Sequence, residues 1–424
     1  MKDIAIIYLL SLSAAICSAT PMLHAQTDTQ TRIFDSNFRS LRAALSRSYY
    51  APPVITLGGN DSIRIEFDEL SPELRYMRYS LLHCDADWNP SDIVESDYVD
   101  GFNQADVTDY QFSSATFANY VHYGITVPNA DMHIRLSGNY LLKVYPEDDN
   151  EQTLLQVRFC VVENQVDILA EVTSRTDIDY NDRHQQVSVM VDAKDYYVDN
   201  MYSDLKLRVS QNSRTDNERS ANTPLRVSGQ KAFFEHDKRL IFPAGNEFRR
   251  FEMTTTNYIG MGVKQYSYHA PFYHAELDID RPRCFDSYSY DQTQYGRFTI
   301  RESNAFDSNT EADYMITHFA LEMPQLQGGA VYVDGEFTQH NFSSSNMMRY
   351  NQNSGCYELD ILLKQGAYNY QYLWVPDGIT IGETGKIEGD FYQTVNEYQI
   401  KVYNRRRGER YDRLVGFTTV FSGK

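Results

Sequence analysis

Five arginines lie close together between positions 405 and 413, in a chain whose formal net charge is −19. Guanidinium groups form paired hydrogen bonds with carboxylates and phosphates, so this run could contact an acidic protein, a nucleic acid or a phospholipid. The negative charge argues against polyanion binding by the whole chain and leaves room only for a local basic patch. The residues are Arg405, Arg406, Arg407, Arg410 and Arg413.

A second candidate for chemistry is the stretch DADWNPSD, from Asp85 to Asp92, which places side-chain oxygens at alternating positions as calcium loops do. A calcium loop of the EF-hand type that started at Asp85 would need Gly at its sixth position and Glu at its twelfth. Those positions hold Pro90 and Ser96. The stretch therefore predicts an Asx-type turn after a strand, with Trp88 packed inward, rather than a metal site.

The remaining chemistry-bearing residues form no recognisable catalytic pattern. His269 and His274 are not at the helical spacing of a zinc site, and the chain has no H-E-x-x-H, G-x-S-x-G or P-loop motif. Paired carboxylates are too frequent in an acidic chain to indicate a glycosidase. We therefore expect no enzyme activity, no cofactor, no metal and no small-molecule substrate, and a role in binding or structure.

The cysteines are spread too widely for a zinc or thioredoxin-type motif, because no C-x-x-C pair occurs. Cys160 lies in the alternating segment VRFCVV and is interpreted first as a small core residue. An oxidising compartment would permit disulfides, and a Cys84–Cys160 bridge remains an open alternative. Cys17 falls in the leader described next; the others are Cys84, Cys160, Cys284 and Cys356.

The N-terminus carries the pattern of a secretory signal peptide. A short charged start precedes the apolar run Ile4 to Leu12, which is too short to span a bilayer, and small residues follow. We expect cleavage after Ala25. Lipidation at Cys17 is the alternative, but Ile16 stands where a small residue is normally required. No later segment is long and apolar enough for a transmembrane helix, so the mature chain is expected to be exported without direct membrane insertion.

The elements that must position these residues are predicted to be strands. A dozen short runs such as SIRIEFDEL, LLQVRFCVV and YNYQYLWV are rich in β-branched and aromatic residues and are separated by Gly, Pro, Asn or Asp. Their even spacing indicates an all-β fold of tandem immunoglobulin-like or early-set sandwiches. Only NFRSLRAALSRS, from Asn37 to Ser48, predicts a helix.

Three contiguous blocks are expected after the signal peptide at 1–25. The N-terminal sandwich is expected at 26–163, the middle sandwich at 164–304, and a C-terminal early-set-like sandwich at 305–424. In the last block, alternation places Tyr368, Tyr370, Tyr372 and Trp374 on one face of a strand. The arginine run falls at a hairpin turn, where Gly408 supplies a positive φ, so its simplest interpretation is a solvated tip.

The C-terminal block resembles the early-set sandwiches that include starch- and glycogen-binding modules. Such modules stack sugars on exposed aromatic rings, usually with a Trp soon after the Gly-x-Phe strand. This chain has GEFTQHNF at that place, and Trp374 lies on a later strand, where core packing is the commoner use. The resemblance leaves a carbohydrate-binding module as the alternative function.

A resemblance of wider extent covers nearly the whole mature chain. The blocks SLLHCDADWNPSDI, DYVDGFNQADVTDYQFSSATFANYVHYGITVPN, SGNYLLKVY, RFCVVE, FPAGNEFRRFE and EGDFYQTVNEYQIKVYNRRRGERYDRLVGF resemble, in order, those of the type IX secretion system plug protein family of Bacteroidetes. One departure is the loop TQHNFSSSN, where a Trp is expected in the family.

The resemblance implies a non-enzymatic periplasmic protein that docks on the large outer-membrane translocon barrel and seals its periplasmic opening when the channel is idle. It implies peripheral association with the outer membrane through the translocon, and no nucleic-acid partner. Because the arginine run has the opposite sign to the rest of the chain, we expect Arg405, Arg406, Arg407, Arg410 and Arg413 to be the residues that bind the partner.

Overall fold

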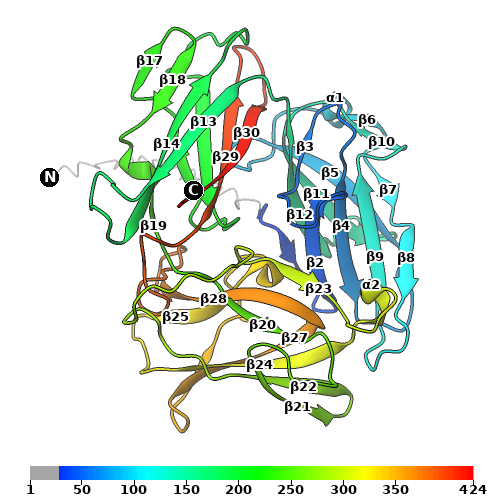
Figure 1. Cartoon of the computed structure of the whole chain (residues 1–424). Helices are drawn as coiled ribbons and strands as arrows, with labels where there is room; N and C mark the ends of the chain where they lie inside the picture. Colours follow the sequence, from blue (N-terminus) through cyan, green and yellow to red (C-terminus); the bar gives the residue numbers. More distant parts are fainter. Residues whose placement is uncertain (1–27, 424) are drawn as a thin grey trace, which may run out of the picture.

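The computed structural model describes residues 28–423, so the predicted signal peptide lies outside the described residues. Almost all regular structure consists of strands, which pair mainly antiparallel, and this confirms the predicted all-β sandwich fold. Within the described part, no helix has the length and apolar character needed to cross a membrane. Three units surround the centre of the molecule in Figure 1, with one at the top, one at the right and one at the bottom.

The first unit, residues 28–163, is a sandwich of two main sheets around one apolar core. A small third pair flanks it, beside α1 (Glu95–Tyr98): β6 (Val99–Gly101) and β10 (Met132–Ile134). One main sheet has the order β1 (Arg32–Ile33), β12 (Leu155–Val162), β11 (Gly138–Pro146), β5 (Met77–Cys84), β7 (Ala105–Asp106), with β3 (Val54–Thr56) parallel to β12. The other has the order β2 (Phe38–Leu45), β4 (Ile63–Glu69), β9 (Val121–Val127), β8 (Asp109–Phe112).

The predicted helix at Asn37–Ser48 is wrong, because this segment forms β2. The reason is a bulge between Arg39 and Arg42, where Ser40 has a φ of 54°. The extra residue interrupts the alternation of buried positions. The buried Phe38 and Leu41 and the partly buried Leu45 are therefore spaced by three and four residues, as on a helix.

The middle unit is built from two distant parts of the chain. One sheet has the order β13 (Asp167–Thr173), β14 (His184–Asp192), β18 (Lys231–Phe234), β17 (Arg226–Ser228), and β19 (Ile241–Pro243), preceded by η1 (Lys238–Leu240), pairs with β14. The other has the order β16 (Arg219–Ala221), β15 (Leu205–Gln211), β29 (Glu397–Asn404), β30 (Arg413–Phe421).

The third unit is formed by the chain between these two parts. One sheet has the order β20 (Arg249–Glu252), β28 (Gly366–Pro376), β23 (Phe298–Ile300), and β25 (Gly329–Asp334) also pairs with β28. The other has the order β21 (Val263–His269), β22 (Phe272–Leu277), β24 (Tyr314–Glu322), β27 (Cys356–Lys364), β26 (Arg349–Asn351). Two short helical turns complete the unit: α2 (Ser308–Glu311) and η2 (Glu336–Thr338).

These sheets do not follow contiguous blocks that divide at 304 and 305. Strands β20 to β23, before that point, share one core with β24 to β28, whereas β29 and β30 pair with β15 of the middle unit. We therefore propose that the third unit is an insertion between β19 and β29. β29 and β30 lie far along the chain from β15, yet they complete its sheet because the inward face of β29 fills the core of the middle unit. Tyr398, Ile400 and Val402 on that face are fully or almost fully buried.

All three units contact one another through buried residues. A small core formed by Trp88, Leu141, Tyr403, Leu414 and their neighbours joins the first unit to the middle unit. Tyr120 and Tyr314 pack edge to face, with ring centroids 5.4 Å apart, where the first unit meets the third. Arg297 of the third unit lies 2.7 Å from Glu397 of the middle unit, and both are buried. The units therefore form one packed body.

Candidate interaction site at the hairpin of residues 405–412

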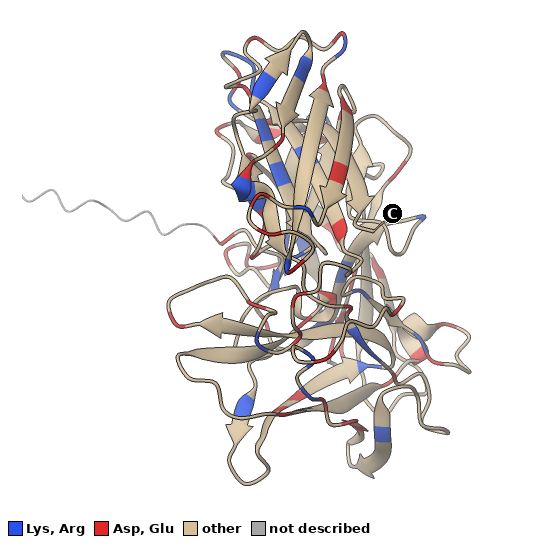
Figure 2. Ribbon diagram, turned by 60° about the vertical axis from the view of Figure 1, so that its left-hand side comes forward, with Lys and Arg blue, Asp and Glu red and all other residues tan. Residues whose placement is uncertain are grey.

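The arginine run lies at the turn of the β29–β30 hairpin, as predicted. The two strands pair antiparallel up to Asn404 and Arg413, which leaves residues 405–412 as the connection. Gly408 has a φ of 90°. Residues other than glycine adopt this conformation only at a cost in free energy, because their Cβ atom clashes with the backbone. In Figure 2, Lys and Arg are interspersed with Asp and Glu over the ribbon of all the units. Residues 405–412 contain four arginines beside Glu409 and Asp412, so the hairpin is a local concentration of basic residues.

Two of the five arginines are held by carboxylates of this chain. Arg405 donates from Nε to Asp412 Oδ1 at 2.9 Å and from Nη2 to Oδ2 at 3.0 Å. Arg413 binds Glu409, with Nη2 and Oε1 2.7 Å apart, and lies 3.3 Å from Glu163 of the first unit. These paired, charge-assisted contacts are the strong kind, so both side chains position the hairpin.

The other three arginines present their charge to solvent. Arg406, Arg407 and Arg410 are exposed, and none forms an ion pair within residues 28–423. The guanidinium of Arg406 lies over the ring of Tyr196, 4.9 Å from its centroid, which restrains that side chain. The predicted five-residue set therefore separates into two structural residues and three that are available to a partner.

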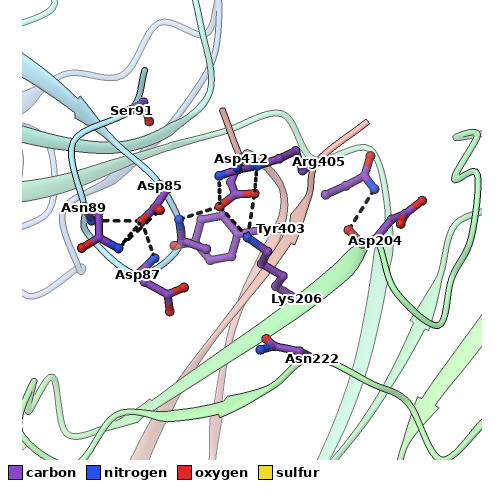
Figure 3. A network of polar contacts seen from close by, with 12 residues as sticks. Asp85, Asp87, Asn89, Ser91, Asp204, Lys206, Asn222, Tyr403, Arg405 and Asp412 are labelled. Atoms are coloured by element: carbon purple, nitrogen blue, oxygen red, sulfur yellow. Dashed lines mark hydrogen bonds and ion pairs between the residues drawn. The ribbon is translucent and has the colours of Figure 1, made fainter. Parts of the chain in front are cut away.

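Asp412 is the centre of the polar network that fixes the hairpin (Figure 3). Its side chain is fully buried and accepts from the backbone N–H of Ala86 at 2.9 Å, from Lys206 Nζ at 2.9 Å and from Arg405. Burial alone would raise the pKa of this carboxyl, but the hydrogen bonds from these three groups more than offset burial and lower it. One carboxylate thus links the hairpin to a strand of the middle unit and to the first unit.

The Asp85 turn of the first unit lies directly beside this network and has the predicted geometry. Asp85 Oδ1 accepts the N–H groups of Asp87 and Asn89, both at 2.9 Å. Trp88 is 7% exposed and lies in the core between the two units, with the guanidinium of Arg158 4.1 Å from its ring centroid. The expected Asx-type turn is confirmed, and its function is to present Ala86 and Trp88 to the middle unit.

Further contacts across this joint involve residues that carry no local signal in the sequence. Tyr403 donates to Asn139 Oδ1 at 2.7 Å, and Asn139 Nδ2 donates to the backbone oxygen of Asp85 at 2.7 Å. Arg208, only 4% exposed, lies 2.7 Å from Asp87 across the same interface. The role of Tyr403, Asn139 and Arg208 is evident only from their buried positions between the two units, which the sequence does not reveal.

The four cysteines within residues 28–423 are free thiols, so the alternative Cys84–Cys160 bridge is not formed. Cys160 is 4% exposed and packs in the core between the first and middle units, as predicted from its strand. Burial raises the pKa of the Cys84 thiol to about 12, which disfavours the reactive thiolate.

The histidines and the tryptophan considered in the sequence analysis, His269, His274 and Trp374, all pack against other side chains of this chain. The rings of His269 and His274 pack edge to face with centroids 4.8 Å apart, and His274 Nδ1 lies 2.8 Å from His318 Nε2. No group of residues within 28–423 has the arrangement of a metal site. Trp374 is 7% exposed and lies in the core of the third unit with Tyr368, so its ring has no open face for a sugar.

Comparison with known proteins identifies a matching family model and solved structures that resemble this chain. A family model described as the Type 9 secretion system plug protein 1st domain matches residues 38–163. The crystal structure of a hypothetical protein from Parabacteroides merdae is 41% identical, with a TM-score of 0.92 over 94% of this chain and all of the other. A Pseudomonas fluorescens alkylpurine DNA glycosylase shares 10% identity over 30% of each chain, and its TM-score of 0.17 supports no relationship. No functionally curated protein matches.

Proposed function

The chain belongs to the type IX secretion system plug protein family, and from that premise we propose that it is a non-enzymatic periplasmic plug. In this proposal it docks on the large outer-membrane translocon barrel of that system and closes the periplasmic opening when the channel is idle. The observation that carries the proposal is the family match over the first unit. A channel wide enough for folded cargo would leak small molecules, so a removable stopper has a physical purpose.

The way the three units are joined suits this role. A stopper must keep its shape when it docks, and it loses less free energy on binding when few of its parts become ordered. Buried contacts join each pair of units here, including the Asp412 network and the Arg297–Glu397 pair. The protein can therefore present fixed loops and edges to the barrel without rearranging.

The hairpin provides a contact suited to reversible docking. Arg406, Arg407 and Arg410 carry exposed positive charge on an otherwise acidic protein. We propose that they contact acidic groups at the periplasmic rim of the barrel, with Arg405 and Arg413 holding the hairpin in position. Exposed charge pairs at a rim accelerate association and fix orientation, and they are weakened by salt.

The test is co-purification from detergent-solubilised outer membranes of the native organism, with the bound protein identified by mass spectrometry. We expect the giant barrel in a specific eluate with the wild-type chain, and less of it at higher salt. The double variant Arg407→Glu/Arg410→Glu should retain less barrel than the control Arg301→Glu, which reverses an exposed arginine on the third unit. Absence of the barrel from a clean wild-type eluate would overturn the proposed function.

A further inference from the structure

Strand β27 of the third unit has a free edge along most of its length. It pairs with β24 from Cys356 to Lys364, but on its other side β26 pairs only with Cys356 to Glu358. No strand within residues 28–423 pairs with Leu359–Leu363 on that side. Some backbone N–H and C=O groups of this segment are therefore left without a sheet partner, and an open edge of this kind accepts a further strand.

A cleft with a volume of about 810 Å³ runs along this free edge, between the first and third units. One wall is the loop 343–347, and the other includes Phe34, Ser36 and residues 38–40 of the first unit. Strand β27 forms the floor, where Leu359 and Ile361 pack against the core of the third unit and remain only partly buried. Phe298, Phe337 and Tyr368 complete the floor.

The rim of the cleft combines neutral polar groups with positive charge. Ser344 and Ser345 are exposed on the loop that closes one side. Arg39 and Arg349 line the two walls, and neither forms an ion pair with a carboxylate within residues 28–423. Arg39 donates to the backbone oxygens of Ser36 and Phe38. The two acidic residues of the cleft are already engaged by this chain: Glu358 by Asn351 and Ser354, Asp360 by His318.

From this arrangement we propose that the cleft receives an extended strand of the translocon, which continues the sheet at Leu359–Leu363. The strand would occupy the position that β26 would take if it were longer. Residues facing the floor would be apolar and would cover Leu359 and Ile361, and those between them would include carboxylates that meet Arg39 and Arg349. This inference rests on the proposed function, because it assigns the anchor for that docking.

An extended strand fits these features better than a compact ligand does. Addition of a strand to a sheet edge uses main-chain hydrogen bonds for affinity and alternate side chains for selectivity. The segment Leu359–Leu363 provides both features. Its backbone is unpaired on one side, and its floor positions Leu359, Ile361 and Leu363 alternate with Asp360 and Leu362. The walls come from two units that are rigidly joined, so the groove exists before the partner arrives.

The experiment uses a photo-crosslinking amino acid at Ser345, in the cleft loop, and at Lys264 as the control. Lys264 is exposed on β21, the opposite edge of the same sheet. We expect a translocon segment to be crosslinked from Ser345 and not from Lys264, and its sequence to alternate apolar and acidic residues. Hydrogen exchange of the purified complex should show added amide protection at Leu359–Leu363.

A charge variant provides a second, quantitative measurement. Arg349 is exposed, so Arg349→Glu should fold normally, and we expect it to weaken barrel retention by about tenfold relative to Arg301→Glu. If the wild type retains the barrel but Ser345 crosslinks no translocon segment, or Leu359–Leu363 gain no protection, the cleft inference fails and the proposed function stands. A crosslink to this chain itself or to a second copy would overturn it equally. Failure of the wild type to retain the barrel would overturn the proposed function first.

Discussion

Lys364 Nζ lies 2.6 Å from Asp68 Oδ2, and both side chains are 1% exposed, although one residue belongs to the third unit and the other to the first. The ammonium also donates to the backbone oxygen of Asn309 at 2.6 Å, and Asp68 accepts from Tyr314 at 2.7 Å. A buried ion pair compensates for its desolvation only when such further hydrogen bonds are present. This contact therefore fixes the orientation of the two units that form the walls of the cleft.

Removing the ammonium should destabilise the protein strongly. Lys364→Met leaves Asp68 buried with its main cationic partner gone, which costs about 3–5 kcal/mol in comparable cases. The measurement is the free energy of unfolding from urea titration. The control Lys194→Met removes an exposed lysine whose ion pair is with Asp167, so it should leave the free energy of unfolding nearly unchanged. The double variant Asp68→Asn/Lys364→Met should recover part of the loss, and equal losses for Lys364→Met and the control would contradict this account.

Glu388 makes part of the stability depend on pH. Burial alone would raise the pKa of this carboxyl, but the guanidinium groups of Arg249 and Arg283 more than offset burial and lower it to about 2. A carboxyl with a lowered folded-state pKa stabilises the fold above its unfolded pKa, near 4.3, and this contribution is lost as the pH falls toward 2. Glu388→Gln should therefore be less stable than the wild type at pH 7, and the difference should shrink between pH 4 and pH 2. A constant difference over that range, measured by chemical unfolding, would exclude the mechanism.

The five hairpin arginines should differ in their effect on stability. Arg405→Ala and Arg413→Ala each break paired hydrogen bonds to carboxylates, so we expect losses of about 1–2 kcal/mol in the free energy of unfolding. Arg407→Ala removes an exposed side chain without an ion pair in the described chain and should change stability by less than about 0.5 kcal/mol. Thermal unfolding of the three variants side by side tests this, and a loss for Arg407→Ala as large as the others would refute the division.

Thiol labelling should distinguish the cysteines by burial. Burial raises the pKa of the Cys160 thiol as it does that of Cys84, and Cys356 is also buried, whereas Cys284 is partly exposed. We expect only Cys284 to react with a thiol reagent in the native mature protein, and slowly, since burial raises the pKa of its thiol as well. In denaturant, Cys84, Cys160 and Cys356 should react too. A pair that stays unreactive in denaturant until a reductant is added would reveal a disulfide.

Much of the local structure could be predicted because alternation and turn chemistry act over a few residues. The alternating aromatic residues of 368–374 do face the core, and Gly408 does supply the positive φ of the hairpin. The bulge in β2 shows the limit of this reasoning, because one extra residue at Arg39–Arg42 converts a strand pattern into one that resembles a helix.

The strand content, the inward faces of those strands and the lack of a recognisable catalytic motif could be predicted from the amino-acid order, since each depends on residue types at short spacing. The folded chain was needed to show that β29 and β30 complete the middle unit, which arginines form ion pairs and where β27 is left unpaired. These features depend on pairs separated by tens to hundreds of residues, such as Ala86 with Asp412 or Asp68 with Lys364. Spacing along a chain carries no information about which distant partner will satisfy a buried charge or cover a sheet edge.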